Sequence, residues 1–261
     1  MPYADLGQYK YHYLDYPNDG KEILCLVHAF TLDHRMWLKE AERFAKDYRV
    51  IVPDLKGHGL SDAPESGYSR KDRVEDFVRF LDALKIDKVH YVGLSYGGTT
   101  GLGVALSYPE RLRSLALVAS SAAGYDMGPK ISKIDQIARE QGVDTAKQRW
   151  ISSSTRWYRD DQSELKQFVT QMMTEHSGAI WADPMRGKYE REYDLDRLGE
   201  IDLPTLVMAG EMDKIFVPLA ERFAGEIKGA RLKIFDRIGH LVNLENHNGF
   251  CEELERFLSN L

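Results

Sequence analysis

One serine is set between an apolar run and a helical pattern, and its surroundings restrict the fold more than any other feature. Residues 93–98 read Gly-Leu-Ser-Tyr-Gly-Gly; residues 90–92 of a predicted strand (His-Tyr-Val) precede them, and a helical pattern runs on through Leu106. On such a strand–turn–helix unit the serine projects its hydroxyl from the sheet, and glycines two positions before and after it relieve crowding. The pattern predicts that Ser95 is a nucleophile at the edge of a sheet.

Short apolar runs alternate with amphipathic helical patterns along most of the chain. Several of these runs are almost continuously apolar, which is typical of strands buried on both faces of a parallel sheet. We therefore predict an α/β fold with a mostly parallel central sheet flanked by helices. The predicted strands are Tyr9–Asp15, Glu22–His28, Arg49–Pro53, Val89–Gly93, Ser114–Ala119, Thr205–Ala209 and Arg231–Phe235. The predicted helices are Met36–Lys46, Arg70–Leu84, Tyr96–Ser107, Leu219–Glu226 and Gly249–Leu258.

The alternation stops between about Gly124 and Leu198, where no buried strand is evident and apolar positions recur at helical spacing. A structureless loop of this length is improbable inside a domain. We predict that residues 1–123 and 199–261 form the core and that residues 124–198 form a helical insertion. Most of its large apolar side chains are expected to pack inside the insertion itself: Trp150, Trp157, Met172, Met173 and Trp181.

Composition excludes several classes of protein. The formal net charge of −6 and the lack of a basic patch argue against nucleic-acid binding. No apolar stretch reaches the ~18 residues of a membrane span, and no leader pattern opens the chain. The two cysteines, Cys25 in an apolar run and Cys251 in the last helical pattern, are too few for a disulfide framework and favour a cytoplasmic protein. No metal, phosphate or dinucleotide motif is present, so we expect no metal or cofactor. A monomer or homodimer is expected.

A serine nucleophile needs a base, and the base needs an orienting acid. His240 follows the predicted strand Arg231–Phe235, and Asp213 lies just past Thr205–Ala209, on the ligand-binding edge of a parallel sheet. The order Ser, Asp, His is the one expected for this kind of turn. Glu211 competes with Asp213, which we favour because it directly precedes the segment leading into the next helix.

The remaining histidines have weaker claims to the site. His12 and His90 lie in predicted strands, His58 is expected to fix a turn, and His247 begins the last helix. His34 lies near the loop after the second strand and could line a pocket, and His176 in the insertion could at most contact substrate.

Five segments together resemble the α/β-hydrolase family, over the whole chain except the insertion. They are residues 28–30 (His-Ala-Phe), 54–59 (Asp-Leu-Lys-Gly-His-Gly), 93–98, 210–213 (Gly-Glu-Met-Asp) and 239–240 (Gly-His). The resemblance implies that the insertion is a cap over the active site. It also implies an oxyanion hole formed by the backbone N–H groups of Tyr96 and Phe30. The family usually has glycine where this chain has Ala29, so the Phe30 assignment requires that Ala29 avoid a glycine-only conformation.

The resemblance also narrows the reaction. Dehalogenases and epoxide hydrolases of this fold use an aspartate where this chain has Ser95, and carbon–carbon bond hydrolases usually carry a Gly-rich oxyanion loop, whereas residues 30–34 read Phe-Thr-Leu-Asp-His. Residues 33–37 and 94–98 look most like small lactonases, such as 3-oxoadipate enol-lactonases, and related carboxylesterases. We therefore expect a serine hydrolase that cleaves a small ester or lactone through an acyl-enzyme. The alternatives are a carbon–carbon bond hydrolase or perhydrolase, or a small-molecule receptor with slow turnover.

Overall fold

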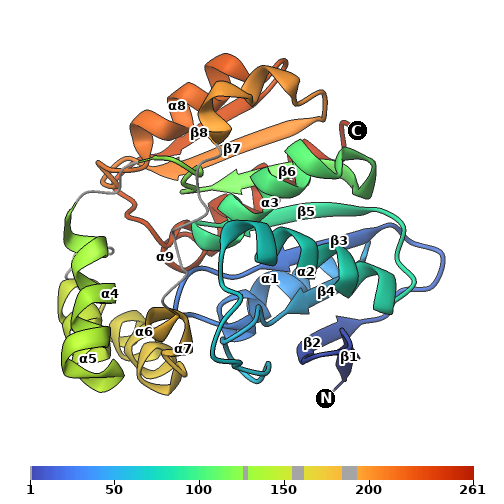
Figure 1. Ribbon diagram of the computed structural model, residues 1–261. Coiled ribbons are helices and arrows are strands. Elements are labelled where there is room, and N and C mark those ends of the chain that lie inside the picture. The colour runs from blue at the N-terminus through green and yellow to red at the C-terminus, as the bar shows by residue number, and fades with distance from the viewer. Residues whose placement is uncertain (1, 126–128, 155–161, 184–192) are drawn as a thin grey trace.

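The central feature of the computed structural model is an eight-stranded sheet with the order β1-β2-β4-β3-β5-β6-β7-β8 (Figure 1). The structure describes residues 2–125, 129–154, 162–183 and 193–261. β1 pairs with β2 and β2 with β4 in antiparallel register, and the other neighbours are parallel. The strands are β1 (Tyr3–Asp5), β2 (Lys10–Tyr16), β3 (Ile23–Val27), β4 (Arg49–Pro53), β5 (Val89–Leu94), β6 (Leu112–Val118), β7 (Thr205–Gly210) and β8 (Arg231–Phe235). The predicted fold class is confirmed.

Helices cover both faces of the sheet, which explains why its inner strands are apolar at most positions. In β3, Leu24 and Leu26 pack on one face with residues of α1 and α10, whereas Cys25 and Val27 pack on the other face with residues of α2, α3 and α8. Burial on both faces removes the alternation that a half-exposed strand shows. The helices of the core are α1 (Leu38–Phe44), α2 (Arg70–Ala83), α3 (Tyr96–Ser107), α8 (Val217–Glu226), α9 (Val242–Glu245) and α10 (His247–Leu258).

The predicted element bounds are confirmed closely where the local signal is strong. β4, β8 and α3 have the predicted bounds, and the bounds of the other predicted elements differ by one or two residues except in one place. The predicted helix Met36–Lys46 is a 3-10 turn over His34–Trp37 followed by α1, because the Asp33 carboxylate caps the backbone N–H of Arg35. β1 was not predicted, since its three residues are too few to show a pattern.

The described part of residues 124–198 is largely helical, as expected. It contains α4 (Pro129–Gln141), α5 (Val143–Ser154), α6 (Ser163–Glu175) and α7 (Ala179–Ala182), which lie together at the lower left of Figure 1. Trp150, Met172, Met173 and Trp181 are buried, and Trp157 lies outside the described residues. The division into core and cap stays a prediction. Among the described residues, no helix is both long and apolar enough to cross a membrane.

Candidate active site

Ser95 occupies the turn between β5 and α3 in a backbone conformation that non-glycine residues rarely adopt. Its φ is 54° and its ψ is −104°. Its N–H donates to the carbonyl oxygen of Val118 at 2.8 Å, and its own carbonyl accepts from the N–H of Thr99 at 2.9 Å. Strained residues of this kind persist only where the surroundings hold them, and they cluster at functional sites. The two hydrogen bonds hold the predicted nucleophile at the carboxyl end of β5.

The glycines on either side of Ser95 allow three segments to come close together. A Cβ on Gly93 would lie 2.4 Å from the carbonyl carbon of Gly97, and a Cβ on Gly97 would lie 2.4 Å from the carbonyl oxygen of Val27. Real Cβ atoms do not approach backbone this closely. The first turn of α3 is therefore pressed against the end of β3, from which the loop carrying Phe30 leaves.

Asp213 and His240 form a short hydrogen bond. The Nδ1 atom of His240 donates to Oδ2 of Asp213 at 2.6 Å, with both side chains nearly buried. The ring of Phe216 lies over the imidazole, with the centroids 4.6 Å apart. Glu211, the competing carboxylate, is exposed and accepts instead from the backbone N–H of Arg237, which lowers its pKa. The structure therefore pairs His240 with Asp213, the carboxylate favoured from the sequence.

All three predicted side chains come from loops at the same edge of the sheet. Ser95 follows β5, Asp213 follows β7 and His240 follows β8, and these strands are parallel members of one sheet. A hydrogen bond from the N–H of Met212 to the carbonyl oxygen of Ile238, at 2.9 Å, ties the second and third loops together. Ligands of open α/β sheets bind at this carboxyl edge. The catalytic roles of the three residues stay a prediction.

Phe30 and Tyr96, the residues expected to supply the oxyanion donors, are neighbours. Their ring centroids lie 5.3 Å apart. The left-handed backbone in this loop falls on Thr31, whose φ is 61°, and Ala29 is not among the residues with positive φ. Ala29 thus satisfies the condition that the Phe30 assignment required, because the unusual conformation lies two residues further along.

The insertion contacts this loop through Trp150. Its indole Nε1 donates to the hydroxyl of Thr31 at 2.9 Å, and that hydroxyl donates in turn to the carbonyl oxygen of Phe30 at 2.6 Å. The rings of Trp150 and Trp181 also stand edge-on to the ring of Phe30, with centroids 5.3 and 5.7 Å away. Sequence reasoning missed this contact, because Trp150 and Thr31 are 119 residues apart and no local pattern links them.

Two buried histidines support the loops around the site. His28 accepts from the backbone N–H of Leu55 through Nε2 at 2.9 Å and donates through Nδ1 to the carbonyl oxygen of Ala29 at 2.8 Å. His58 donates to the carbonyl oxygen of Lys56 at 3.0 Å, within the turn that it was expected to fix. Burial lowers the pKa of His28 and lowers that of His58 well below its usual range. Both imidazoles are therefore neutral parts of the framework.

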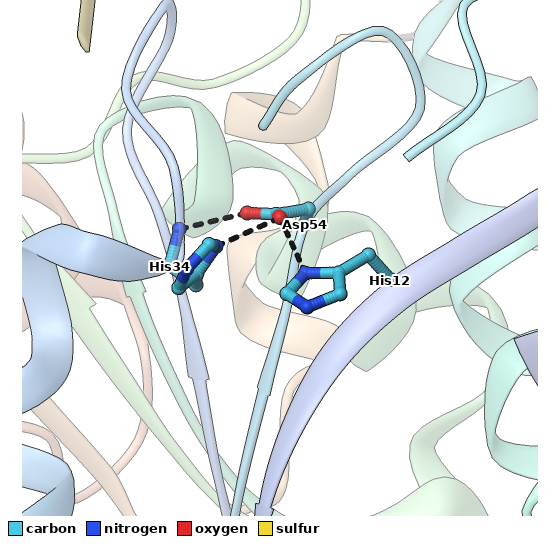
Figure 2. A group of neighbouring side chains, drawn as sticks. All are labelled: His12, His34 and Asp54. Carbon is cyan, nitrogen blue, oxygen red and sulfur yellow. Dashed lines mark hydrogen bonds and ion pairs between the residues drawn. The ribbon is translucent and has the colours of Figure 1, made fainter. Parts of the chain in front are cut away.

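His34 lines a cavity of about 390 Å³ between the loop after β3 and helix α6, as its position suggested. Figure 2 shows its imidazole and that of His12 on either side of the Asp54 carboxylate, which accepts from both Nδ1 atoms at 2.8 and 2.7 Å. Although burial lowers the pKa of His34, the hydrogen bond to Asp54 and its charge raise that pKa above its ordinary value. The cavity is further lined by Thr31, Leu32, Asp33, Arg35, Gly59, Leu60, Met172, Glu175 and His176.

His12, His90 and His247 lie where the sequence placed them, in β2, in β5 and at the first position of α10. His90 bonds the hydroxyl of Ser114 and the carboxylate of Glu22, at 2.8 and 3.0 Å. Among the contacts that the structure describes, none joins these three side chains to Ser95, Asp213 or His240.

Comparison with known proteins agrees with this fold. The model of the alpha/beta hydrolase fold family matches residues 22–247. The chain belongs to this family. A Bacillus subtilis (strain 168) protein provisionally named 2-succinyl-6-hydroxy-2,4-cyclohexadiene-1-carboxylate synthase is 27% identical to this chain. The match covers 94% of this chain and 93% of the length of that protein. The 3-oxoadipate enol-lactonase 2 of Acinetobacter baylyi (strain ATCC 33305 / BD413 / ADP1) is 26% identical, over 94% of this chain and 91% of its own.

A solved structure shows the same α/β-hydrolase fold over nearly the whole chain. The enol-lactonase from Burkholderia xenovorans LB400 superposes with a TM-score of 0.88 at 23% sequence identity. The superposition covers 99% of this chain and 100% of the enol-lactonase chain. At that identity the likeness establishes the fold. The reaction has to be argued from the site.

Proposed function

We propose that this α/β-hydrolase is a serine hydrolase that cleaves a small carboxylic ester or lactone through an acyl-enzyme. The observation that carries the proposal is the 2.6 Å hydrogen bond between Asp213 and His240, made at the sheet edge where Ser95 stands in its strained turn. An imidazole whose Nδ1 donates to a carboxylate presents its other nitrogen, Nε2, as a base. A serine held beside such a base is an activated nucleophile.

The proposed reaction has two halves. In the first, Nε2 of His240 takes the hydroxyl proton of Ser95 while Oγ attacks the carbonyl carbon, and the same proton then passes to the leaving alkoxide. In the second, His240 takes a proton from water, the resulting hydroxide attacks the acyl-enzyme, and the proton returns to Oγ as the acid leaves. Asp213 holds the tautomer of His240 and stabilises the imidazolium in both halves.

The negative oxygen of each tetrahedral intermediate needs donors that are already in place. The backbone N–H groups of Tyr96 and Phe30 are proposed for this role, and each such donor typically contributes about 3–4 kcal/mol to the rate. The contact between their rings and the hydrogen bond from Trp150 to Thr31 fix the loop that carries Phe30. The proposed donors therefore require little reorganisation during the reaction.

Two lines of support favour an ester or lactone as the substrate. The Acinetobacter relative is named an enol-lactonase, and its similarity extends over nearly the full length of both chains. The rings of Phe30, Trp150 and Trp181 pack together where the insertion meets the loop after β3, and such an apolar surround suits a small uncharged acyl group.

A turnover assay tests the proposal. The purified protein is given p-nitrophenyl acetate and butyrate, and then γ- and δ-lactones whose opening is followed by acid release. We expect many turnovers per chain, and a loss of at least about 10⁴-fold in kcat for Ser95→Ala. A single burst followed by a stable adduct would instead indicate a receptor. If folded protein neither turns over an ester or lactone nor forms an adduct with one, the proposed reaction is wrong.

A further inference from the structure

Among the described residues, two clusters of histidine, acidic and cysteine side chains lie outside the candidate active site, and the atoms of each are close enough to surround a metal ion. One is His12, His34 and Asp54, and the other is Glu40, His247 and Cys251; in each, one ligand atom per residue lies within 4.8 Å of the others. Histidine, cysteine and carboxylate side chains are the usual ligands of zinc. The two clusters differ in how completely hydrogen bonds satisfy their carboxylates.

Hydrogen bonding alone accounts for the carboxylate of the first cluster, although Nε2 of His12 has no partner among the described residues. Oδ2 of Asp54 accepts from the Nδ1 atoms of His12 and His34 (Figure 2) and from the backbone N–H of Leu60. Oδ1 accepts from the backbone N–H of His34 at 2.7 Å. Four donors thus occupy a carboxylate that has about four acceptor positions. An ion would have to displace these bonds, and His12 and Asp54 are fully buried, so we assign no metal to this cluster.

The second cluster joins two helices, α1 and α10, that lie far apart in the sequence. Glu40 lies in α1, and His247 and Cys251 lie four residues apart in α10, which places them on one face of that helix. Nδ1 of His247 lies 2.8 Å from Oε1 of Glu40 and 3.8 Å from the sulfur of Cys251. In a tetrahedral zinc site, nitrogen and sulfur ligands are about 3.5 Å apart. The histidine and cysteine are therefore already spaced almost as zinc ligands are.

Two buried oxygen atoms at this cluster have no hydrogen-bond partner among the described residues. They are Oε2 of Glu40 and Oδ1 of Asn243, and both residues are at most 1% exposed. The amide of Asn243 lies beside the Glu40 carboxylate. Buried oxygens of this kind usually have a partner, and its absence calls for an explanation such as an ion. A cation bound at the cluster would satisfy the free oxygen of Glu40.

We propose that Glu40, His247 and Cys251 bind one divalent transition-metal ion, with zinc the best fit. Thiolate, imidazole and carboxylate together suit this metal, and the fourth position is left to Asn243 or to water. As the sulfur–metal bond forms, the proton of the Cys251 thiol passes to solvent. The His247 side chain is 28% exposed, which gives the ion an entry path.

Such an ion would link α1 to the segment that follows His240. α9 begins two residues after His240 and leads directly into α10, so the bound metal would fasten the end of the His240 loop onto the core. The expected effect is on folding stability, because metal bound by the folded state alone stabilises that state. The site does not depend on the proposed function.

Zinc binding by the full chain tests the inference. Protein stripped with a chelator is titrated with Zn²⁺ against a competing chromophoric chelator. We expect one ion per chain, bound tighter than about 1 µM, and a rise in Tm with zinc. Cys251→Ser and Glu40→Gln should weaken binding at least about tenfold. The matched control, His34→Gln in the first cluster, should leave affinity and stoichiometry unchanged.

Cobalt gives a second readout that does not depend on a variant folding. Co²⁺ bound by the wild-type protein should show a thiolate charge-transfer band in the near ultraviolet. The inference fails if folded wild-type protein binds no zinc in this range, if cobalt shows no such band, or if His34→Gln removes the binding and folded Cys251→Ser retains it.

Discussion

Replacing Asp213 by Asn removes one negative charge next to His240 and changes the side-chain volume very little. With both side chains nearly buried, the charges of the carboxylate and the imidazolium, about 4 Å apart, interact by about 4 kcal/mol at an effective dielectric constant of about 20. Losing that interaction would slow the catalysed reaction by about 10³-fold. An Asn amide that donates to Nδ1 also favours the tautomer protonated on Nε2, which cannot accept the proton of Ser95. We therefore expect kcat to fall by about 10⁴.

The assay is steady-state hydrolysis of p-nitrophenyl butyrate at neutral pH, with the far-ultraviolet circular dichroism of each variant checked first. Glu211→Gln is the matched control: this carboxylate is two residues away but is exposed and bonded to the backbone of Arg237. The control should keep kcat within about twofold, as for other exposed side chains. If Asp213→Asn stays within tenfold of the wild-type rate, or if Glu211→Gln is the more damaging change, the assignment of the orienting acid is wrong.

Three further results are expected. Gly97→Ala should lower the free energy of unfolding by about 3 kcal/mol or prevent folding, as measured in urea, because its Cβ would lie 2.4 Å from a backbone oxygen of β3; an unchanged midpoint would contradict this. A double-mutant cycle of Trp150→Phe and Thr31→Val should give a coupling energy of about 1 kcal/mol in unfolding, and a value near zero would mean that their 2.9 Å hydrogen bond contributes nothing. The folded-state pKa of His34 is raised, so protonation of His34 stabilises the fold. This stabilisation is complete below about pH 6.5 and is lost as the pH rises through the folded-state pKa. Urea melts of His34→Gln at a series of pH values should therefore lack this pH dependence of the free energy of unfolding.

The elements of the fold were predictable from the sequence where the signal is local. The turn at Ser95 requires glycine at 93 and 97, and the structure shows the close approaches that impose this requirement. The inner strands are mostly apolar because both of their faces are covered. β1 was missed because its pairing with β2 is a tertiary contact of three residues. The start of α1 differed because a side-chain cap at Asp33 favours a 3-10 turn first.

The residues of the candidate site were predictable where they directly follow strands of the sheet. Asp213 and His240 each follow a strand, so the common edge of the sheet brings them together. Contacts between segments that are distant in sequence left no such pattern, and the bond from Trp150 to Thr31 is one of them. The sequence likewise could not show that Thr31, and not Ala29, takes the left-handed conformation. That placement depends on how the loop packs between the sheet and the insertion.

Labelling by a serine-directed fluorophosphonate tests the central claim most directly. The reagent should add to the folded protein at one site per chain, and peptide mass spectrometry should locate the adduct on Ser95. Ser95→Ala should not be labelled, and unfolding the wild-type protein should abolish the reaction, because activation depends on His240 held by Asp213. An unlabelled folded protein, or an adduct on any other serine, would contradict the account.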